Sequence, residues 1–467
     1  VGLFAKVREG KEAGMAGTTR FGWLLTGLAL LVSIAGLAAT INVPGDYATI
    51  QAAINAASPG DTIQVAAGTY TENVTVNKIV GLVGMAGALL QGSGGNGFLI
   101  QAPNVSIQGF EIKGYATGVR TYGGPSDFGT LELRDLVITG NTIGVQVNRD
   151  GFSTVTIDGC QITGNTQEGM SVIDHLCGAL QIGKFIIKDS NVSNNGRHGL
   201  MLVRTKIDTL SIENSSFDGA TTNGYSGISF VSSPSQVGTF TMSGGSLSRN
   251  KGSGLSVIQA GHILGHIVFD GVIFQGNGEN GIILGGGATA GELTILNSYF
   301  SGNAWEEVDI SGGWFGSFAV TGATTIQGNS FVRSGGTWVA IYIGDHASFG
   351  DVPRINNNNI IGYGIAHYAD AFLVDFSGNW WGTAAGRVLG GNSAYSPWLA
   401  NNIAEPNWTF AVDDVGTKPP EGWLQAALNQ ARSGDTVLVK AGEYVTQGIV
   451  GSSVKIIGEP GAVVKSP

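Results

Sequence analysis

The feature that most constrains this chain is a short phrase, Ile162-Thr163-Gly164-Asn165, which returns in altered form about every 24 to 30 residues where no copy is missed. A repeat of this length is too long for a hairpin repeat and suits one turn of a solenoid, in which each repeat packs on its neighbours. Each copy ends in asparagine. The copies that we assign to one structural turn ladder are Asn141, Asn165, Asn195, Asn250, Asn277, Asn303 and Asn329.

Apolar pairs surround each asparagine at fixed distances. Around Asn165 these pairs are Val155 and Ile157, Cys160 and Ile162, and Met170 and Val172. Alternation with a period of two is typical of strands, so each repeat is predicted to form three strands. Coils stacked about 4.8 Å apart would place every strand beside its copy, which predicts an all-β, parallel β-helix with three sheets around a dry core. Seventy-six glycines without a Gly-X-Y period exclude collagen.

The asparagine is expected at the turn between the second and third strands, in a left-handed conformation, with its amide bonded to the next copy. We therefore interpret the asparagines as structural. Cys160 takes the place of Ser190 and Ser298 in other repeats and is expected to act as a small apolar residue. Two cysteines without metal-site spacing predict no metal site and leave the state of Cys160 and Cys177 open.

Residues 1–40 are predicted to contain a secretory signal, with Met15 as the natural start. The apolar run from Phe21 to Ala39 contains small residues at Gly36 and Ala38 that fit a cleavage site. The same run is long enough to remain as a membrane anchor, but no basic stop-transfer segment follows, which favours cleavage. Membrane contact is expected through this segment only, and the protein is expected to be secreted or held at the cell surface.

After the signal, Ile50 and Ile54 share one face of a short helix that ends before Pro59-Gly60. Such a helix would cover the open end of a solenoid. The surrounding segment resembles the N-terminal segment of pectin-lyase-like right-handed parallel β-helix proteins, which implies a right-handed coil. The matching pieces are Val43-Pro44-Gly45-Asp46-Tyr47, Ile50-Gln51-Ala52-Ala53-Ile54, Gly60-Asp61-Thr62 and Gly68-Thr69-Tyr70-Thr71-Glu72.

The later chain predicts where this domain ends. Asn379-Trp380-Trp381-Gly382 and Tyr395-Ser396-Pro397-Trp398-Leu399 resemble the closing segment of NosD-like and related bacterial surface β-helix domains. We therefore expect a β-helix domain over residues 41–403 and a linker over 404–422. Residues 423–467 repeat the N-terminal segment and are expected to begin a second, truncated β-helix. The chain is then a fragment of a longer protein, which a stop codon directly after Pro467 would overturn.

The net charge of the chain limits the classes of partner that it can bind. A net charge of −10 and a pI near 5.1 argue against nucleic acid, because such binders concentrate Lys and Arg on one face. A polysaccharide or cell-wall glycan is the partner that the resemblance implies, and the solenoid is expected to be monomeric.

Two hydrolytic chemistries lack their motifs. Gly68-Thr69-Tyr70-Thr71-Glu72 matches the first motif of pectin methylesterases, but no segment corresponds to that family's Gln-Asp-Thr, Asp-Phe-Ile-Phe-Gly or Leu-Gly-Arg-Pro-Trp motifs. Esterase activity is therefore not expected. A polygalacturonase-type Asp-Asp pattern is also absent, so the sequence offers no anchor for two-carboxylate hydrolysis.

A polysaccharide lyase would need a basic residue and acids that hold Ca²⁺ against a uronate. The densest polar group in the repeats supplies the catalytic candidates Arg204, His198, Asp174 and Glu168. Candidates for carbohydrate binding are His175, Arg197, Trp305, Trp314 and Tyr342, since aromatic faces can stack on sugars. The favoured alternative is a solvated turn with one ion pair worth about 0 to 1 kcal/mol, and aromatics that only pack.

Three functions therefore stay open at the level of sequence. The leading one is an exported cell-surface or secreted β-helix protein that recognises polysaccharide, whether or not it is an enzyme. The second is a structural or adhesive stalk of a modular surface protein. The third is a Ca²⁺-dependent polysaccharide lyase, the one case in which a cofactor is expected.

Overall fold

The computed structural model describes residues 38–122, 129–148, 151–174, 180–222, 225–310, 316–334, 339–362, 364–367, 374–380, 388–389, 393–394, 398–399, 409–412, Leu424, 427–428, 431–445 and 453–465. The predicted signal segment up to residue 37, most of the linker, His175, Cys177 and Trp314 lie outside these ranges. No helix among the described residues is both long and apolar enough to cross a membrane.

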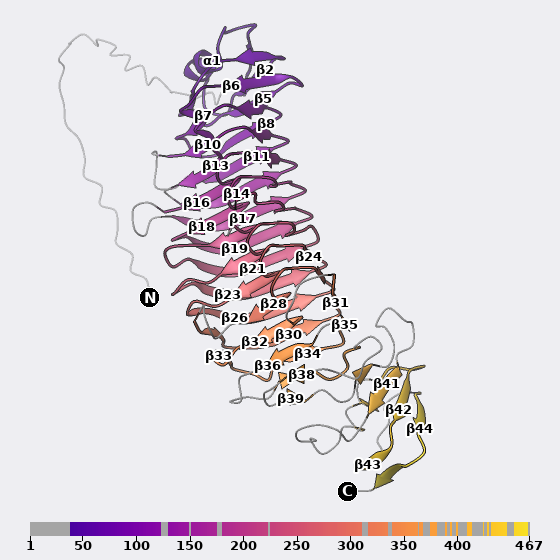
Figure 1. The fold of residues 1–467 in the computed structure, drawn as a ribbon. Coiled ribbons are helices and arrows are strands. Elements are labelled where there is room, and N and C mark those ends of the chain that lie inside the picture. The colour runs from indigo at the N-terminus through magenta and orange to yellow at the C-terminus, as the bar shows by residue number, and fades with distance from the viewer. Residues whose placement is uncertain are drawn as a thin grey trace, which may run out of the picture. The chain divides into compact units, whose positions relative to one another are not determined.

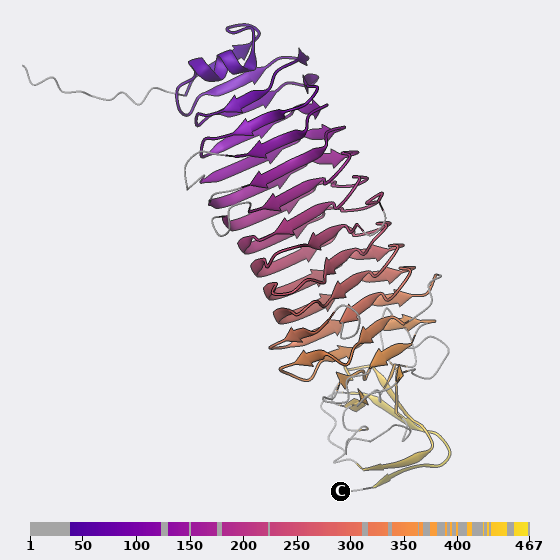
Figure 2. The ribbon, with the colours of Figure 1, turned by 60° about the vertical axis from the view of Figure 1, so that its left-hand side comes forward.

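The chain winds into a parallel β-solenoid whose coils stack from indigo to orange in Figures 1 and 2. Most coils add a strand to each of three sheets, here called A, B and C in chain order. Sheet A contains β1 (Thr40–Val43), β2 (Thr62–Val65), β5 (Gly81–Gly84), β8 (Val105–Gln108), β11 (Thr130–Arg134), β14 (Phe152–Asp158), β17 (Gln181–Lys188), β19 (Lys206–Glu213), β21 (Gln236–Ser243), β23 (Ile263–Asp270), β26 (Ala288–Leu296), β29 (Phe318–Val320), β30 (Thr324–Gln327), β33 (Ala347–Phe349), β34 (Arg354–Asn356), β37 (Val374–Asp375) and β39 (Ser393–Ala394).

Sheets B and C complete each coil. Sheet B contains β3 (Gly68–Tyr70), β6 (Ala88–Gln91), β9 (Glu111–Lys113), β12 (Val137–Thr139), β15 (Gln161–Thr163), β24 (Ile273–Gln275), β27 (Tyr299–Ser301), β31 (Ser330–Val332) and β35 (Asn359–Ile361). Single bridges through Asn191, Ser216 and Ser246 join its two halves. Sheet C contains β4 (Val74–Val76), β7 (Asn96–Ile100), β10 (Thr117–Thr121), β13 (Ile143–Asn148), β16 (Met170–Ile173), β18 (Leu200–Val203), β20 (Ile228–Phe230), β22 (Leu255–Val257), β25 (Ile282–Leu284), β28 (Val308–Ile310), β32 (Ile341–Ile343), β36 (Ile365–His367) and β38 (Val388–Leu389).

The strands pair in the register that the apolar pattern predicts. In sheet A, buried residues stack in the order Leu131, Val155, Phe185, Leu210, Phe240, Ile267 and Leu293. In sheet C, the corresponding column runs through Met170, Leu200, Ile228, Leu255, Ile282 and Val308. Because parallel strands in register bring like residues together, the core is one continuous apolar column, and the all-β, three-sheet parallel fold is confirmed.

One part of the predicted register is wrong. The spacing of Cys160 and Ile162 before Asn165, applied to Asn329, predicts that Thr324 and Ile326 lie in the second strand of their coil. They lie instead in β30 and pair with Leu293 and Ile295 of sheet A. Asn329 therefore stands at the corner between sheets A and B, one corner earlier than Asn303. The count failed because Gly-Asn also occurs at this other turn.

The helix α1 (Ile50–Ala56) lies over β1, β2 and β4, as expected for a cap on the first coil (Figure 1). It buries Ile50, Ala53 and Ile54. Its first amides are capped by Thr49, whose side chain accepts from Ala52 N, and by Glu72, whose carboxylate accepts from Ile50 N and Gln51 N at 2.9 and 3.0 Å. A carboxylate is stabilising at a helix N-terminus. Glu72, which belongs to the motif that matches pectin methylesterases, thus has a structural role as a cap of α1.

Buried asparagines form a hydrogen-bond ladder at the corner between sheets B and C, here called the B/C corner. Asn165 Nδ2 donates to Asn195 Oδ1 at 3.0 Å and to the carbonyl of Ile138 at 3.2 Å. The same contacts join Asn141 to Asn165, and Asn250 to Asn277 and then Asn303. Asn329 belongs to a second ladder at the corner between sheets A and B, where it bonds Asn358, which in turn bonds Asn379.

The asparagines do not adopt the left-handed conformation that we expected. Positive φ occurs instead at the preceding residue, which is Gly164 (φ 65), Asn194 (φ 55) or Arg249 (φ 55) in three of the coils. The glycine of the phrase therefore makes the turn, and the asparagine side chain points inward to satisfy backbone groups that the turn leaves unpaired.

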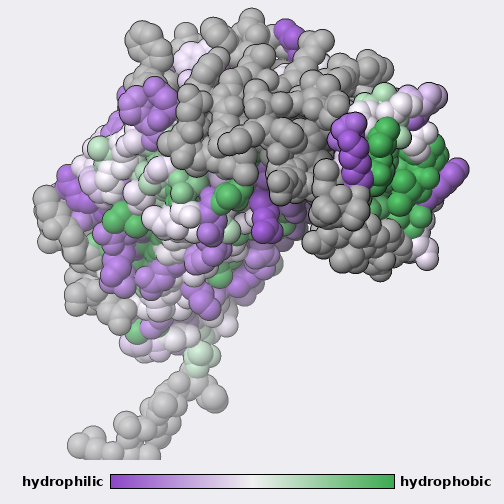
Figure 3. Space-filling model, turned by 90° about the horizontal axis from the view of Figure 1, so that it is seen from below, coloured by the Kyte–Doolittle hydropathy of each residue, from purple (hydrophilic) through white to green (hydrophobic). Residues whose placement is uncertain are grey.

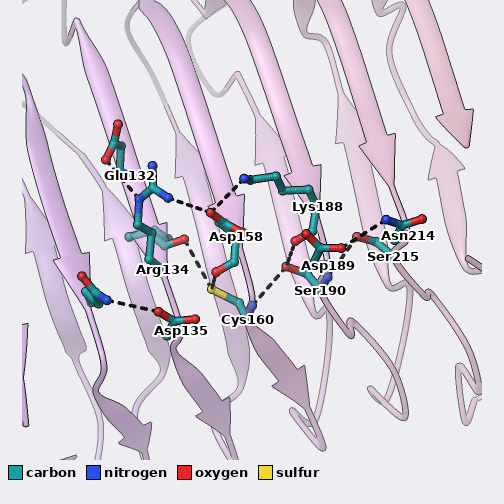
Figure 4. Close-up of polar contacts among 12 residues, drawn as sticks. Glu132, Arg134, Asp135, Asp158, Cys160, Lys188, Asp189, Ser190, Asn214 and Ser215 are labelled. Carbon is teal, nitrogen blue, oxygen red and sulfur yellow. Dashed lines mark hydrogen bonds and ion pairs between the residues drawn. The ribbon is translucent and has the colours of Figure 1, made fainter.

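Cys160 also serves a corner, that between sheets A and B (Figure 4). Its amide donates to Ser190 Oγ at 3.1 Å, and Ser190 N donates to Ser215 Oγ at 3.0 Å. The thiol is free, lies 3.4 Å from the carbonyl oxygen of Leu133 and has its pKa raised to about 11 by burial. Cys160 thus shares its column with Ser190, as predicted, and also acts there as a hydrogen-bonding group.

The C-terminal segment repeats the local structure of the first coils. β40 (Trp398–Leu399), β41 (Thr409–Val412), β42 (Thr436–Val439) and β44 (Lys455–Gly458) form one sheet, and β43 (Gly442–Val445) pairs with β45 (Ala462–Lys465). Gly434 has φ 96, as Gly60 has φ 97. Tyr444 bonds the carbonyl of Lys440 as Tyr70 bonds that of Ala66, each at 3.0 Å. Apolar side chains are exposed in this segment, among them Val464. Figure 3 shows a hydrophobic patch on the surface of the molecule.

Replacing Asn277 with alanine should destabilise the solenoid by about 2 to 3 kcal/mol, because it leaves the backbone amide of Asn250 and the carbonyl of Leu247 buried without partners. The free energy of unfolding in guanidinium measures this. Asn191→Ala removes only a contact to Gln161 near the surface and should cost about 0.5 kcal/mol or less. Equal losses in the two variants would contradict a structural role for the ladder.

Candidate functional site

A column of outward residues follows the B/C corner from coil to coil. We call it the corner column: Gln167, Arg197, Tyr225, Gly252, Glu279 and Trp305. Backbone hydrogen bonds connect its neighbours, from Arg197 N to Gln167 O at 3.0 Å, from Gly252 N to Tyr225 O at 2.8 Å and from Trp305 N to Glu279 O at 3.2 Å. The asparagine ladder beneath fixes this turn, so the column stands on a rigid support.

Arg197 and Tyr225 form the first half of the corner column. Arg197 Nη1 lies 3.5 Å from Glu168 Oε1, and its guanidinium carbon lies 5.6 Å from the centre of the Tyr225 ring. The Arg197 side chain is 42% exposed, whereas that of Glu168 is 4% exposed. Glu168 therefore holds an accessible cation over an aromatic face, an arrangement that can bind a polar ligand.

His198 lies beneath this pair. Its ring meets the Tyr225 ring edge-on at 4.8 Å, and its Nδ1 accepts from Ser226 N at 3.1 Å. Burial lowers the pKa of His198 to about 4, so the imidazole is neutral at pH 7. With Nδ1 accepting, the neutral ring carries its proton on Nε2.

Carboxyl groups and a tryptophan form the second half of the corner column. Ser253 Oγ donates to Glu279 Oε2 at 3.3 Å, and Asn280 Nδ2 donates to Glu306 Oε2 at 2.9 Å. Burial raises the pKa values of both glutamates. Neither belongs to an ion pair within the described ranges. Trp305 beside them is 39% exposed.

The predicted catalytic candidates do not meet at one place. Glu168 and His198 lie at the B/C corner, but Asp174 and Arg204 follow the far ends of β16 and β18, at the corner between sheets C and A. There Arg204 Nη2 donates to Ser233 Oγ at 3.1 Å. The two pairs are separated by the length of a strand. Counting residues from the asparagine does not predict this separation, because it gives the position along the coil and not the distance between side chains.

The carbohydrate-binding candidates are divided too. Arg197 and Trp305 stand in the corner column, whereas Tyr342 lies on the outer face of sheet C, opposite Asp309 of the neighbouring strand. His175 and Trp314 lie outside the described residues.

Sequence reasoning missed Tyr225 and Glu279. Tyr225 lies in a coil whose ladder asparagine is replaced by Ala220. The backbone amide of Ala220 donates to Asn250 Oδ1 at 2.8 Å. Without the asparagine as a mark, the coil was not counted. Glu279 could have been found, because it follows Asn277 by the same two residues that separate Arg197 from Asn195.

A second polar group lies on the outer face of sheet A (Figure 4). Asp158 Oδ2 accepts from Arg134 Nη1 at 2.7 Å and lies 3.2 Å from Lys188 Nζ, while Arg134 Nε contacts Glu132 at 3.3 Å. These charges neutralise one another across three coils. Such surface pairs contribute about 0 to 1 kcal/mol each, and they offer a ligand fewer uncommitted groups than the B/C corner does.

The B/C corner is hollowed toward its N-terminal end. A depression of about 270 Å³ is lined by small or buried residues of four successive turns: Ser93, Gly94, Gly114, Tyr115, Ala116, Gly140, Asn141, Thr142 and Thr166. Its lining ends at Thr166, the residue before Gln167. Across the described ranges, no three His, Cys, Asp or Glu residues are grouped so that they could hold a metal ion.

Comparison with known families identifies the coil. Residues 61–264 match the family model described as right-handed β-helix region, so this part of the chain is a right-handed β-helix and the resemblance inferred from its sequence is confirmed. A search of curated proteins finds no match.

Several solved structures are similar to this chain over much of its length. They include the pectate lyase Pel9A (13% identity, 78% of this chain and 80% of that one, TM-score 0.34). An alginate lyase from Paenibacillus sp. str. FPU-7 matches at 17% identity over 76% and 99%, with a TM-score of 0.29. A PL6 family polysaccharide lyase from Pseudopedobacter saltans matches at 13% over 82% and 97%, with a TM-score of 0.38.

Replacing Glu306 with glutamine should stabilise the protein at pH 7. Burial raises the pKa of Glu306, so the folded state favours the protonated form and ionisation above that pKa costs stability. We expect the melting temperature to rise by on the order of 1 °C at pH 7, with no gain at pH 4. Glu132→Gln, in an exposed pair on sheet A, is the control and should produce no rise. A lower melting temperature for Glu306→Gln at pH 7 would contradict this account.

His198 should make the fold sensitive to acid. Its folded pKa lies below the unfolded value, so its contribution is complete above about pH 6.5 and is lost as the pH falls toward 4. Asparagine can keep the bond from Ser226 N but does not titrate. Between pH 7 and pH 4.5, the wild type should lose about 2 kcal/mol more unfolding free energy than His198→Asn. Parallel stability curves for the two proteins would refute this.

Proposed function

We propose that this chain is an exported β-helix protein that recognises polysaccharide along the B/C corner. The observation that carries the proposal is the corner column itself, in which Arg197 over Tyr225 and the exposed Trp305 stand on one edge of a rigid solenoid. Linear glycans present alternating apolar ring faces and hydroxyl groups, which aromatic faces and charged hydrogen-bonding groups complement.

The location outside the cell is part of the same proposal. Its support is the apolar run from Phe21 to Ala39, preceded by Arg20 and containing small residues at its end. Signal cleavage would release the β-helix, and retention of the run would tether it to the membrane.

Binding of the full chain to a glycan array tests recognition, and Arg197→Ala tests its place. Removal of the Arg197 cation should lower the affinity for the glycan that the wild type binds by about fivefold to tenfold. Arg134→Ala is the matched control, because Arg134 is 39% exposed and also paired with a carboxylate, but lies on sheet A. Equal weakening by both variants, or wild-type binding to no glycan, would overturn the proposal. Release of unsaturated uronates with Ca²⁺ would assign a lyase activity in addition.

A structural stalk is the second candidate, and the C-terminal segment favours it. Residues 424–465 have a buried cluster of their own, which includes Leu424, Leu428, Val437 and Val439. Their turns repeat those of the first coils, which supports a second solenoid unit as part of this proposal. Solenoid units in series are suited to act as spacers. A stalk would leave the glycan array without signal.

A further inference from the structure

The stretch of the corner column between Tyr225 and Trp305 is suited to one class of glycan. We propose that it binds an uncharged, hydroxyl-rich polysaccharide that lies along the solenoid, with a sugar ring on Trp305 and hydroxyl groups donating to Glu279 and Glu306. This inference rests on the proposed function and names its ligand.

The negative charges of this stretch disfavour binding of a uronate polymer. Two partly buried glutamates, Glu279 and Glu306, stand on its last two coils, while the adjacent Glu307 is fully buried and accepts a hydrogen bond from Asn303. Their cationic neighbours are few, since Arg197 contacts Glu168, Arg249 contacts Asp218, and the exposed Lys251 is one lysine against two carboxyl groups. Carboxylates repel an anionic chain, whereas they accept hydrogen bonds readily from sugar hydroxyl groups.

The glutamates keep capacity to accept. Each has one side-chain donor, Ser253 for Glu279 and Asn280 for Glu306, while a carboxylate offers about four lone-pair sites. Both are partly buried without a cationic partner, an arrangement that costs stability in the free protein. Groups that bind ligands commonly carry such a cost, because they are arranged for the complex.

Asn280 supplies an independent sign that a donor is missing. The Asn280 side chain is fully buried. Its Nδ2 donates to Glu306, but its Oδ1 has no hydrogen-bond partner among the described residues. Buried polar groups are normally paired, so this oxygen favours a ligand, or a water held by it, that brings hydroxyl protons to the corner.

The spacing of the corner column fits a linear chain. Tyr225, Gly252, Glu279 and Trp305 follow one another on four successive coils, and each step is about 4.8 Å, the distance between neighbouring strands. Gly252 is buried and has no side chain, so Tyr225, Glu279 and Trp305 supply the outward side chains of this stretch. The exposed Trp305 ring offers an apolar platform at its end.

The test compares two panels of polymers on the full chain: neutral mannan, glucan and galactan, and anionic polygalacturonate and alginate. Neutral polymers should bind, and Trp305→Ala should weaken that binding about tenfold, because it removes the platform. Tyr299→Ala is the control, since Tyr299 is 37% exposed on the same coil but lies on sheet B. Its binding should match the wild type.

Charge reversal separates the inference from the proposed function. Glu279→Lys should weaken binding of the neutral polymer and bring measurable binding of polygalacturonate. If the wild type prefers the anionic polymers, or if EDTA abolishes binding of the neutral ones, the inference fails while polysaccharide recognition stands. If neither panel binds, the proposed function fails as well. Equal effects of Trp305→Ala and Tyr299→Ala would place the ligand elsewhere and overturn the inference.

Discussion

The structure depends on the pairing of each strand with its copy in the next coil. Parallel pairing in register satisfies the backbone inside the sheets, but each coil must also turn three corners, where amides and carbonyls leave the ladder. Buried side chains bond these groups instead. At the B/C corner, Asn277 accepts from the amide of Asn250 at 3.0 Å and donates to the carbonyl of Leu247 at 2.9 Å. Asparagine fits because its amide both accepts and donates.

This division of roles explains why chemistry gathers beside the ladder. The inward positions are committed to the core, where Phe274, Phe300 and Phe331 stack at 4.7 and 4.8 Å, the spacing of the coils. On sheet A, the outward charges pair with one another across neighbouring strands. The turns at the B/C corner are longer and can change from coil to coil without disturbing the sheets. Arg197, Glu279 and Trp305 occupy equivalent places there and differ freely, as loop residues of a rigid scaffold do.

Much of the fold could be predicted from the sequence, because a solenoid translates a period in the chain into a position in space. The strand pairs of sheets A and C and the cap formed by Ile50 and Ile54 follow from apolar alternation and agree with the structure. The count failed where the mark itself was ambiguous. Gly328-Asn329 looks like the B/C turn but makes the turn between sheets A and B, and Gly164 rather than Asn165 takes the left-handed conformation.

The candidate site was less accessible to the same reasoning. Whether two residues are close depends on which corner of the coil each occupies. Counting from the asparagine places Asp174 and Arg204 on adjacent coils, but it does not show that they lie at a different corner from His198. Tyr225 stayed hidden because its coil carries Ala220 instead of asparagine. Burial raises the pKa values of Glu279 and Glu306, and Asn280 Oδ1 has no partner among the described residues. Both features arise from packing between coils, so they could not be predicted from the sequence.

The central claim is that ligand binds along the B/C corner, and hydrogen–deuterium exchange of the full chain with and without a bound neutral polysaccharide tests it most directly. The account predicts slower exchange of amides in the turns around residues 225, 252, 279 and 305, since a ligand there restricts their opening. The outer strands of sheet A should exchange at unchanged rates. Protection confined to sheet A, or to the corner between sheets C and A near Arg204, would contradict the account.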